Sequence, residues 1–263
     1  MNNIQEYLTI LKECNSFKDR FAIFIYILGT PKRMIDRKFN RKVRHSLIYG
    51  VNLENQYGKF YCGDNMLGVR AGASSFENEV KHFFSLDNGV FIDVGAHIGR
   101  WTITIGNKLK GKVIAIEPQK DNFNMLKRNI YINKLNDIVI PLDVACGDKE
   151  KEMKFYLDLE GGGGHESSLV QNEYNKKKFT LVKVRKLDNI FVDLKLDSVD
   201  LIKVDVEGSD LDVLKGAKNI IKRFHPRIIF EAFGDKEYNG IKNFLDNYNY
   251  KFQRTSGITH LAY

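Results

Sequence analysis

Cysteine is scarce in the 263-residue sequence and widely scattered. Cys14, Cys62 and Cys146 do not form the closely spaced groups that bind zinc, and no signal-peptide pattern precedes them. A disulfide framework is typical of secreted chains with a denser set of cysteines. We therefore expect a reduced, cytoplasmic protein with no metal site.

A long apolar run is also missing. The longest, Phe21 to Leu28, is far shorter than the roughly 20 residues that a membrane-spanning helix needs. Much of the formal net charge of +8 lies in the segment from Lys32 to Arg44, and the rest of the chain is close to balanced. Residues 21–44 could therefore bring the protein to an anionic membrane surface. Binding of nucleic acid is a less favoured alternative, because no recognisable RNA-binding module accompanies the basic segment.

The distribution of apolar residues predicts one α/β catalytic domain after an extension. With 43% hydrophobic residues, the chain can bury one large core. Residues 1–60 show helical spacing of apolar residues without a chemical motif, so we expect a basic, helical N-terminal extension. From about residue 88, short β-branched runs alternate with amphipathic stretches. This pattern predicts a doubly wound, Rossmann-like parallel sheet in a domain of residues 61–263. The expected strands are residues 90–94, 112–116, 138–142, 201–205 and 227–231, with two further β segments near 250–253 and 258–263.

An insertion interrupts this alternation. Two alternating segments, 153–157 and 179–184, are separated by a polar loop from Gly161 to Ser168. His165 follows four glycines in this loop, so it could swing over a cleft and serve in catalysis or substrate binding, although a loop histidine is often merely exposed. After the insertion, we expect one helix through Leu211, Leu214 and Ile221.

A glycine turn follows the first expected strand. Asp93, Gly95 and Gly99 form the pattern D-x-G-x-x-x-G, which differs from the G-x-G-x-x-G of nicotinamide enzymes. Gly95 would let a ligand approach the backbone closely, and amides of the next helix could receive a carboxylate. Ala96 and His97 lie within the turn and join the candidate cofactor-binding set. On its own, the pattern also fits a plain tight turn.

Acidic residues end the next two strands. Glu117 could accept hydrogen bonds from both hydroxyls of a ribose, and Asp143 would lie where an adenine amino group binds. Pro118 and Val144 follow these acids and complete the cofactor-binding set. Either acid alone could be a solvated turn residue or a helix cap. Three acids at successive strand ends, with glycines at the first, together outline one crevice at the carboxyl edge of the sheet.

Two acids at the end of the fourth strand are candidates for the acceptor side of the site. Alternation in a strand would place Asp205 and Glu207 on one face, where a carboxylate could position an acceptor hydroxyl and take its proton. Glu231, from the next strand, could support them. Alternatively, one of the pair caps the helix that starts near Ser209. Methylation of a nucleobase amine would call for an Asn-Pro-Pro-Tyr-type sequence, and the chain contains none. This absence favours a hydroxyl as the acceptor.

These residues resemble the FkbM-type methyltransferases, a branch of the class I methyltransferase superfamily, over roughly Gly68 to Glu231. The matching segments are Phe91 to Gly99, Ala115 to Pro118, Ser167 to Leu169, Leu187-Asp188, Ile202 to Gly208 and Leu214 to Ala217. The resemblance implies a seven-stranded class I fold with an antiparallel last strand. It also implies S-adenosylmethionine as the cofactor and methylation of a sugar, glycan or natural-product hydroxyl.

The family's roles carry over residue by residue. Asp93, Gly95 and Gly99 would hold the methionine part of the cofactor and Glu117 its ribose. Asp143 would lie on the adenine side, and Asp205 and Glu207 on the acceptor side. His97 departs from the family pattern, which usually has asparagine there.

The sequence therefore favours an S-adenosylmethionine-dependent O-methyltransferase acting on a small-molecule or glycan acceptor. The expected reaction is an in-line displacement that needs no metal, with alignment, dehydration and a proton acceptor supplied by the protein. An RNA methyltransferase that uses the basic segment is one alternative, and a catalytically silent cofactor-binding scaffold is another. The presence of Asp93, Glu117, Asp205 and Glu207 argues against the scaffold, and the glycine spacing argues against a nicotinamide dehydrogenase.

Overall fold

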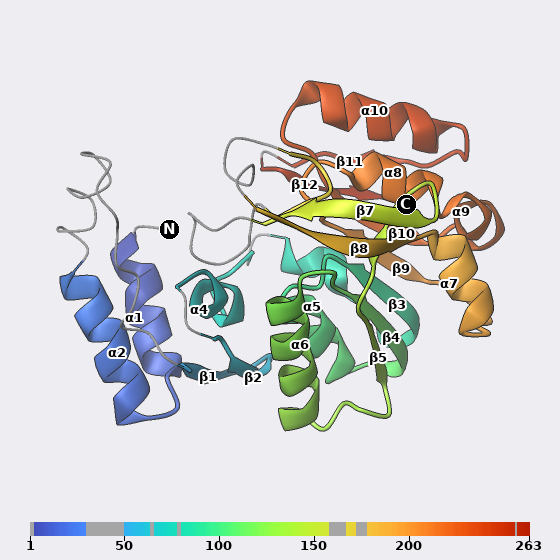
Figure 1. Cartoon of the computed structure of the whole chain (residues 1–263). Helices are drawn as coiled ribbons and strands as arrows, with labels where there is room; N and C mark the ends of the chain where they lie inside the picture. The colour runs from blue at the N-terminus through green and yellow to red at the C-terminus, as the bar shows by residue number, and fades with distance from the viewer. Residues whose placement is uncertain are drawn as a thin grey trace. The chain divides into compact units, whose positions relative to one another are not determined.

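The chain divides into two compact units, Met1–Asn78 and Glu79–Tyr263. The boundary predicted near residue 60 falls inside a strand of the first unit, so the extent of the catalytic domain stays a prediction. A computed structural model of the chain (Figure 1) describes residues 3–29, 50–63, 66–77, 80–157, 167–171, 178–255 and 257–263. None of the helices in these ranges has the length and apolarity to span a bilayer.

Helices α1 (Asn3–Glu13) and α2 (Phe17–Leu28) begin the first unit, as the spacing of apolar residues predicts. Ser16 starts α2, because its hydroxyl oxygen accepts a hydrogen bond from the backbone N–H of Asp19. Another helix, α4 (Met66–Gly72), lies later in this unit.

The prediction that helices fill the chain to residue 60 is wrong for its last part. There β1 (Asn52–Asn55) and β2 (Gly58–Tyr61) pair as an antiparallel hairpin. The side chain of Asn55 accepts a hydrogen bond from the amide of Tyr57, which stabilises the turn locally. This turn chemistry, rather than apolar spacing, determines the local structure.

A seven-stranded sheet in the order β11-β12-β10-β9-β3-β4-β5 forms the centre of the second unit. Its strands are β3 (Asn88–Val94), β4 (Lys110–Ile116), β5 (Val139–Leu142), β9 (Leu201–Val204), β10 (Arg227–Glu231), β11 (Phe252–Gln253) and β12 (Thr259–Ala262). Strands β3, β4, β5, β9 and β10 pair in parallel, and β12 is antiparallel to β10 and β11. The predicted doubly wound sheet with an antiparallel last strand is therefore confirmed. The strand order reverses between β3 and β9, which is where such sheets bind ligands.

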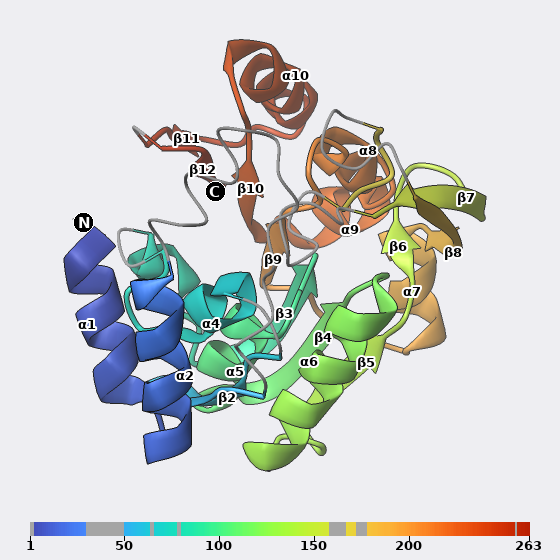
Figure 2. The ribbon, with the colours of Figure 1, turned by 60° about the vertical axis from the view of Figure 1, so that its left-hand side comes forward.

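Helices cover both faces of this sheet (Figure 2). On one face lie α5 (Arg100–Gly106) and α6 (Lys120–Ile132). The other face packs against α7 (Leu187–Asp193), α8 (Asp210–Lys215), α9 (Lys218–Phe224) and α10 (Asp235–Asp246). A 3-10 helix, η1 (Lys81–Phe84), precedes β3.

Side-chain alternation in the central strands separates the core from the site. Ile92 of β3 and Ile202 of β9 are fully buried and pack with α7 to α10. The neighbouring Asp93 and Lys203 are register partners and point to the opposite face, where α5 supplies a hydrogen-bonding threonine, Thr102. Charged side chains can lie in the middle of a buried sheet here because they partner one another.

The single helix expected through Leu211, Leu214 and Ile221 is wrong, because the segment forms two helices, α8 and α9. The break follows Gly216, where a Cβ atom would lie 2.1 Å from the carbonyl oxygen of Gly147. Asp188 of α7 accepts hydrogen bonds from the first backbone amides of α9, at 3.0–3.1 Å. Those amides have no partner within the helix, so a capping carboxylate stabilises a new start there.

A small separate sheet accounts for the predicted insertion. Strands β6 (Ala145–Cys146), β7 (Lys151–Tyr156) and β8 (Phe179–Arg185) form it in the order β6-β8-β7, and β7 and β8 are antiparallel. Ser168, just after the glycine loop, forms a bridge to Tyr156. His165 and the basic segment Lys32 to Arg44 lie outside the described residues.

Candidate active site

The carboxyl edge of the central sheet carries the predicted acids on neighbouring strands. Asp93 lies in β3, Glu117 follows β4 and Asp143 follows β5, while Asp205 follows β9 on the other side of β3. Asp93 and Glu117 are buried, Asp205 is partly buried, and Asp143 is exposed. The sheet therefore brings acids from four adjacent strands to one edge.

The glycine turn after β3 is bound tightly into the protein. Gly95 has φ +79°, and a Cβ atom there would lie 1.8 Å from the carbonyl oxygen of Asp205. The close approach that we expect of a ligand is thus made by the chain itself. The amides of Gly95 and Ala96 donate to the carbonyl of Ile116, and that of Gly99 donates to Ala96. These three amides are therefore engaged within the protein. That amides of the next helix receive a carboxylate stays a prediction.

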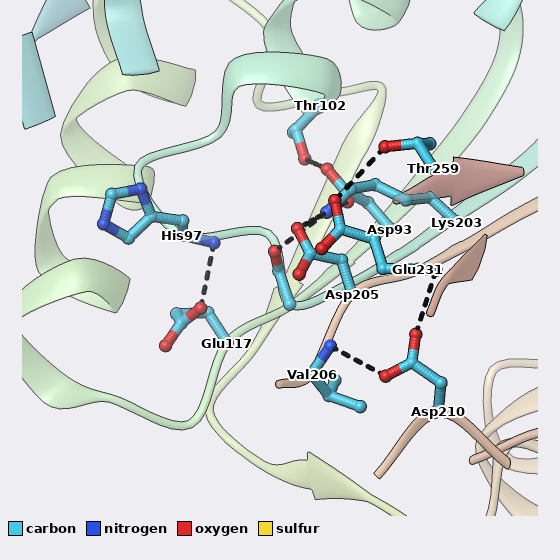
Figure 3. A network of polar contacts seen from close by, with 11 residues as sticks. Asp93, His97, Thr102, Glu117, Lys203, Asp205, Val206, Asp210, Glu231 and Thr259 are labelled. Carbon is cyan, nitrogen blue, oxygen red and sulfur yellow. Dashed lines mark hydrogen bonds and ion pairs between the residues drawn. The ribbon is translucent and has the colours of Figure 1, made fainter. Parts of the chain in front are cut away.

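Glu117 connects the turn after β3 with the turn after β4. Its Oε2 accepts the amide N–H of His97 at 2.9 Å (Figure 3). Its Oε1 accepts that of Gln119 at 2.8 Å. Burial raises the pKa of Glu117 to about 7, and the two amide hydrogen bonds act in the opposite direction. His97 adopts the left-handed conformation, with φ +52°. This strained geometry at a non-glycine residue is held by the Glu117 contact.

Lys203 lies between two carboxylates beneath the turn (Figure 3). Its Nζ is 2.9 Å from Oδ2 of Asp205 and 3.7 Å from Oδ1 of Asp93, and it donates to the carbonyl oxygen of Gly95 at 3.3 Å. Thr102 donates to the other oxygen of Asp93 at 2.6 Å. Burial raises the pKa of Asp93, while Lys203 and Thr102 lower it. One ammonium thus connects the turn after β3 with the end of β9.

A second carboxylate, that of Glu231, lies beside Asp205. One oxygen of each lies within 4.8 Å of the other. Glu231 ends β10, and its Oε1 accepts a hydrogen bond from the hydroxyl of Thr259 in β12 at 3.3 Å. The structure therefore places Glu231, which we expected only to support Asp205 and Glu207, beside Asp205.

The segment after β9 is a loop, so the expectation that Asp205 and Glu207 share one strand face is wrong. β9 ends at Val204, and Glu207 adopts φ +54°. The hydroxyl of Ser168 donates to the carbonyl oxygen of Glu207 at 3.0 Å. Neither acid is the N-cap residue of α8, because Ser209 occupies that position. Asp210, the first residue of α8, binds the loop. Its two carboxylate oxygens accept the amides of Val206 and Glu231 at 3.4 and 3.3 Å (Figure 3).

The model of the methyltransferase FkbM domain matches residues 93–252 of this chain. The match covers more than half of the chain and includes the acids described above, from Asp93 to Glu231. The chain belongs to the FkbM methyltransferase family. S-adenosylmethionine is the methyl donor of this family.

Curated relatives of this FkbM domain match over about half of the chain. The chain is 28% identical over 160 residues to methyltransferase sdnD of Sordaria araneosa. This alignment covers 49% of the chain and 60% of the relative. The chain is 27% identical over 137 residues to the hexuronic acid methyltransferase AglP of Haloferax volcanii. This alignment covers 52% of the chain and 53% of the relative. The FkbM domain thus spans little more than half the length of these proteins.

A solved structure with the same fold supports the topology. The crystal structure of methyltransferase FkbM from Methylobacillus flagellatus aligns with 99% of this chain and 59% of its own, at 16% identity and a TM-score of 0.51. At this identity the similarity shows the shared fold.

The chemistry of the FkbM domain's strand-end residues fits its cofactor. Each oxygen of Glu117 accepts one amide, and a carboxylate oxygen can accept a second hydrogen bond, so ribose hydroxyls can bind without displacing the turn. Asp93 is only 1% exposed and is held by Thr102 and Lys203. Its position therefore suits support of the turn rather than direct contact.

The remaining predicted residues of the FkbM domain lie at the rim. Asp143 forms an exposed ion pair of 2.7 Å with Lys120, which solvent screens strongly. Pro118 is partly buried behind Glu117, and Val144 packs against the core. Their cofactor contacts, the catalytic role of His165 and the expected absence of a metal stay predictions.

Lys203 and Asp210 are the main residues of this site that sequence reasoning misses. For Lys203 a signal exists: a lysine interrupts an otherwise apolar central strand, and the strand beside it carries Asp93. For Asp210 the signal is weaker, since an acid at a helix start usually interacts with its own helix. Here burial raises the pKa of Asp210 well above its usual range, with the nearby charge of Asp205 as a further cause.

Proposed function

We propose that this FkbM methyltransferase transfers a methyl group from S-adenosylmethionine to a hydroxyl of a sugar, glycan or natural-product-like acceptor. The observation that supports this best is the pair of carboxylates, Asp205 and Glu231, next to the turn after β3, with Asp205 paired to Lys203. Carboxylates at this position can accept the proton that a hydroxyl loses on methylation.

The donor side would be held by the turn after β3 and by Glu117. The cofactor, when bound, supplies an electrophilic methyl group on a sulfonium. Glu117 would accept the ribose hydroxyls, and Asp143 would face the adenine once its exposed ion pair with Lys120 opens. Asp93 and Lys203 would keep the turn in place from below.

The acceptor side would be formed by Asp205, with Glu207 and Glu231 beside it. Lys203 fixes the orientation of the Asp205 carboxylate, so one of its oxygens can face an incoming hydroxyl. Asp210 holds the backbone of the loop after β9 against the end of β10. Positioning of this kind can lower a barrier by roughly 7–11 kcal/mol in favourable cases, so loss of one acid is expected to slow the reaction rather than abolish it.

A sugar acceptor is the first class to test. The relative AglP is named for methylation of a hexuronic acid, and sugars are rich in the hydroxyls that this site suits. The curated relatives also include a tRNA-modifying transferase, so RNA belongs among the acceptors tested.

The test is transfer of radiolabelled methyl from S-adenosylmethionine to a panel of sugars, lipid-linked glycans, small hydroxylated metabolites and RNA. The expected result is label on a hydroxyl that withstands base treatment, formed about a hundredfold or more slowly by the Asp205→Asn, Glu207→Gln variant. Label on RNA alone would replace the proposal with an RNA methyltransferase. Donor binding without transfer to any acceptor would favour a silent scaffold.

A further inference from the structure

Helix α2 of the first unit exposes a stripe of large apolar side chains. Phe17, Phe21, Phe24 and Leu28 are 82%, 55%, 49% and 61% exposed. Their spacing of four, three and four residues places them within about 60° of one another around the helix, since each residue turns about 100°. The rings of Phe17 and Phe21 stack with centroids 6.4 Å apart. The side chains therefore form one continuous surface, which we call the α2 stripe.

The opposite side of α2 is anchored in the unit. Ile23 is completely buried and Asp19 is 4% exposed. The hydroxyl of Ser16 donates to the carboxylate of Asp19 at 2.8 Å. The same hydroxyl oxygen accepts a hydrogen bond from the backbone amide of Asp19, in the first turn of the helix. The orientation of the helix is thus determined by its buried face, and the α2 stripe faces away from that core.

The charges of α1 and α2 are sorted by sign. Among the described residues of these two helices, the acids Glu6, Glu13 and Asp19 turn inward. Glu6 pairs with Arg70, and Glu13 accepts hydrogen bonds from Asn55 and Ser74. The bases Lys12, Lys18 and Arg20 are exposed.

Lys18 and Arg20 flank the α2 stripe on its two sides, at about 100° and 60° from Phe17 by the same helical geometry. The chain that follows α2 is basic as well, with seven Lys or Arg and one Asp from Lys32 to Arg44. The outer surface of the helix is therefore apolar in the middle and positive at both sides.

We propose that the α2 stripe docks on the surface of an anionic lipid membrane. Phenylalanine rings entering the headgroup region lose water contact, while flanking lysine and arginine meet lipid phosphates. A second copy of the chain fits less well, because Lys18 and Arg20 would approach their own counterparts and the acids of α1 and α2 face inward. RNA also fits less well, since four side chains without hydrogen-bonding groups match acyl chains better than phosphates. Such docking is independent of the proposed methyl transfer.

The test is co-sedimentation of the full chain with vesicles of phosphatidylcholine alone and of phosphatidylcholine with phosphatidylglycerol. The wild type is expected to sediment with the anionic vesicles. Phe17→Ser, Phe21→Ser, Phe24→Ser together are expected to weaken this partition at least about tenfold. Lys18→Gln, Arg20→Gln should weaken it about fivefold for each charge. The control is Phe179→Ser, Leu181→Ser on β8, which removes two exposed apolar side chains, 48% and 60%, from the other unit and should not change the sedimentation.

Several outcomes would overturn the proposal. One is a wild type that stays in the supernatant with anionic vesicles. Another is a serine triple variant that sediments like the wild type, which would assign binding to the basic segment alone. A dimer seen by light scattering that the triple variant abolishes, without vesicle binding, would assign the stripe to self-association. Binding to RNA without binding to vesicles would assign the stripe to a nucleic-acid partner. Thermal unfolding of each variant, which is expected to match the wild type, confirms that the fold is intact.

Discussion

A Cβ atom on Gly95 would lie 1.8 Å from the carbonyl oxygen of Asp205. The turn on the cofactor side and the segment on the acceptor side are therefore in backbone contact, with no room for a side chain between them. Lys203 strengthens this contact by donating to the carbonyl oxygen of Gly95 and pairing with the carboxylate of Asp205. Changes on one side of this contact are expected to affect the other side.

Gly95→Ala is expected to impair both stability and cofactor binding. The methyl group collides with the backbone of Asp205, and alanine is also strained at φ +79°. Together these effects should cost at least about 2 kcal/mol in the free energy of unfolding. Denaturant unfolding and calorimetric titration with S-adenosylhomocysteine measure the two losses. Gly240→Ala in α10 is the control, because its new Cβ atom meets only ordinary contacts, at 3.5 Å. Equal behaviour of the two variants would contradict the account of the turn.

Lys203→Met should destabilise the fold by about 3 kcal/mol, because it leaves buried Asp93 and its neighbour Asp205 without their ammonium partner. The double variant Asp93→Asn, Lys203→Met is expected to recover part of this loss. Chemical denaturation of the wild type, both single variants and the double variant provides the complete cycle. Strictly additive losses would show that the two charges do not interact.

Glu117 makes the stability depend on pH. Its pKa in the fold, about 7, lies above the ordinary 4.5 because of burial, so folding takes up a proton between these values. The protonated carboxyl of Glu117 therefore adds to the free energy of unfolding. This contribution is fully present below about pH 4.5 and is lost as the pH rises through 7. Between about pH 5 and pH 8 the wild type should lose on the order of 3 kcal/mol more than Glu117→Gln. Asp93 and Asp210 titrate in the same direction in both proteins, so the difference between the proteins is the diagnostic quantity. Parallel pH profiles would show that Glu117 is not responsible.

The Asp205→Asn, Glu207→Gln variant should bind the cofactor and turn over slowly. A positioned proton acceptor contributes about a hundredfold or more to the rate, and alignment by the rest of the site persists. Single-turnover methyl transfer on an identified acceptor measures the loss, and Asp212→Asn, an exposed acid of α8, is the control. Normal binding with full-speed transfer would refute acidic catalysis at these residues.

Apolar patterning predicted the central fold well. Strands such as β3 and β4 are buried on both faces and so read as apolar runs. The ends of β3, β4 and β9 position Asp93, Glu117 and Asp205 without further information. The errors arise where single tertiary contacts override the local pattern. Helices α8 and α9 are separate because Gly216 packs on Gly147 and Asp188 caps the second one, and neither contact is visible in the spacing of leucines.

The site itself could be predicted only as a set of acids. The sequence indicates which carboxylates reach the edge of the sheet, but not that Lys203 pairs with two of them, since that pairing depends on the register of β3 and β9. The left-handed conformation of Glu207 was likewise hidden, because the contacts around it come from a distant segment, at Ser168.

Cofactor binding is the claim on which the rest depends, and calorimetric titration measures it most directly. The purified protein is titrated with S-adenosylmethionine, S-adenosylhomocysteine and, as a control, NAD, alongside Asp93→Ala and Glu117→Ala. We predict binding of both sulfur compounds at micromolar levels, no binding of NAD, and loss of binding in both variants. No heat of binding from the wild type, or unchanged affinity in Glu117→Ala, would contradict the assignment of this edge of the sheet as the cofactor site.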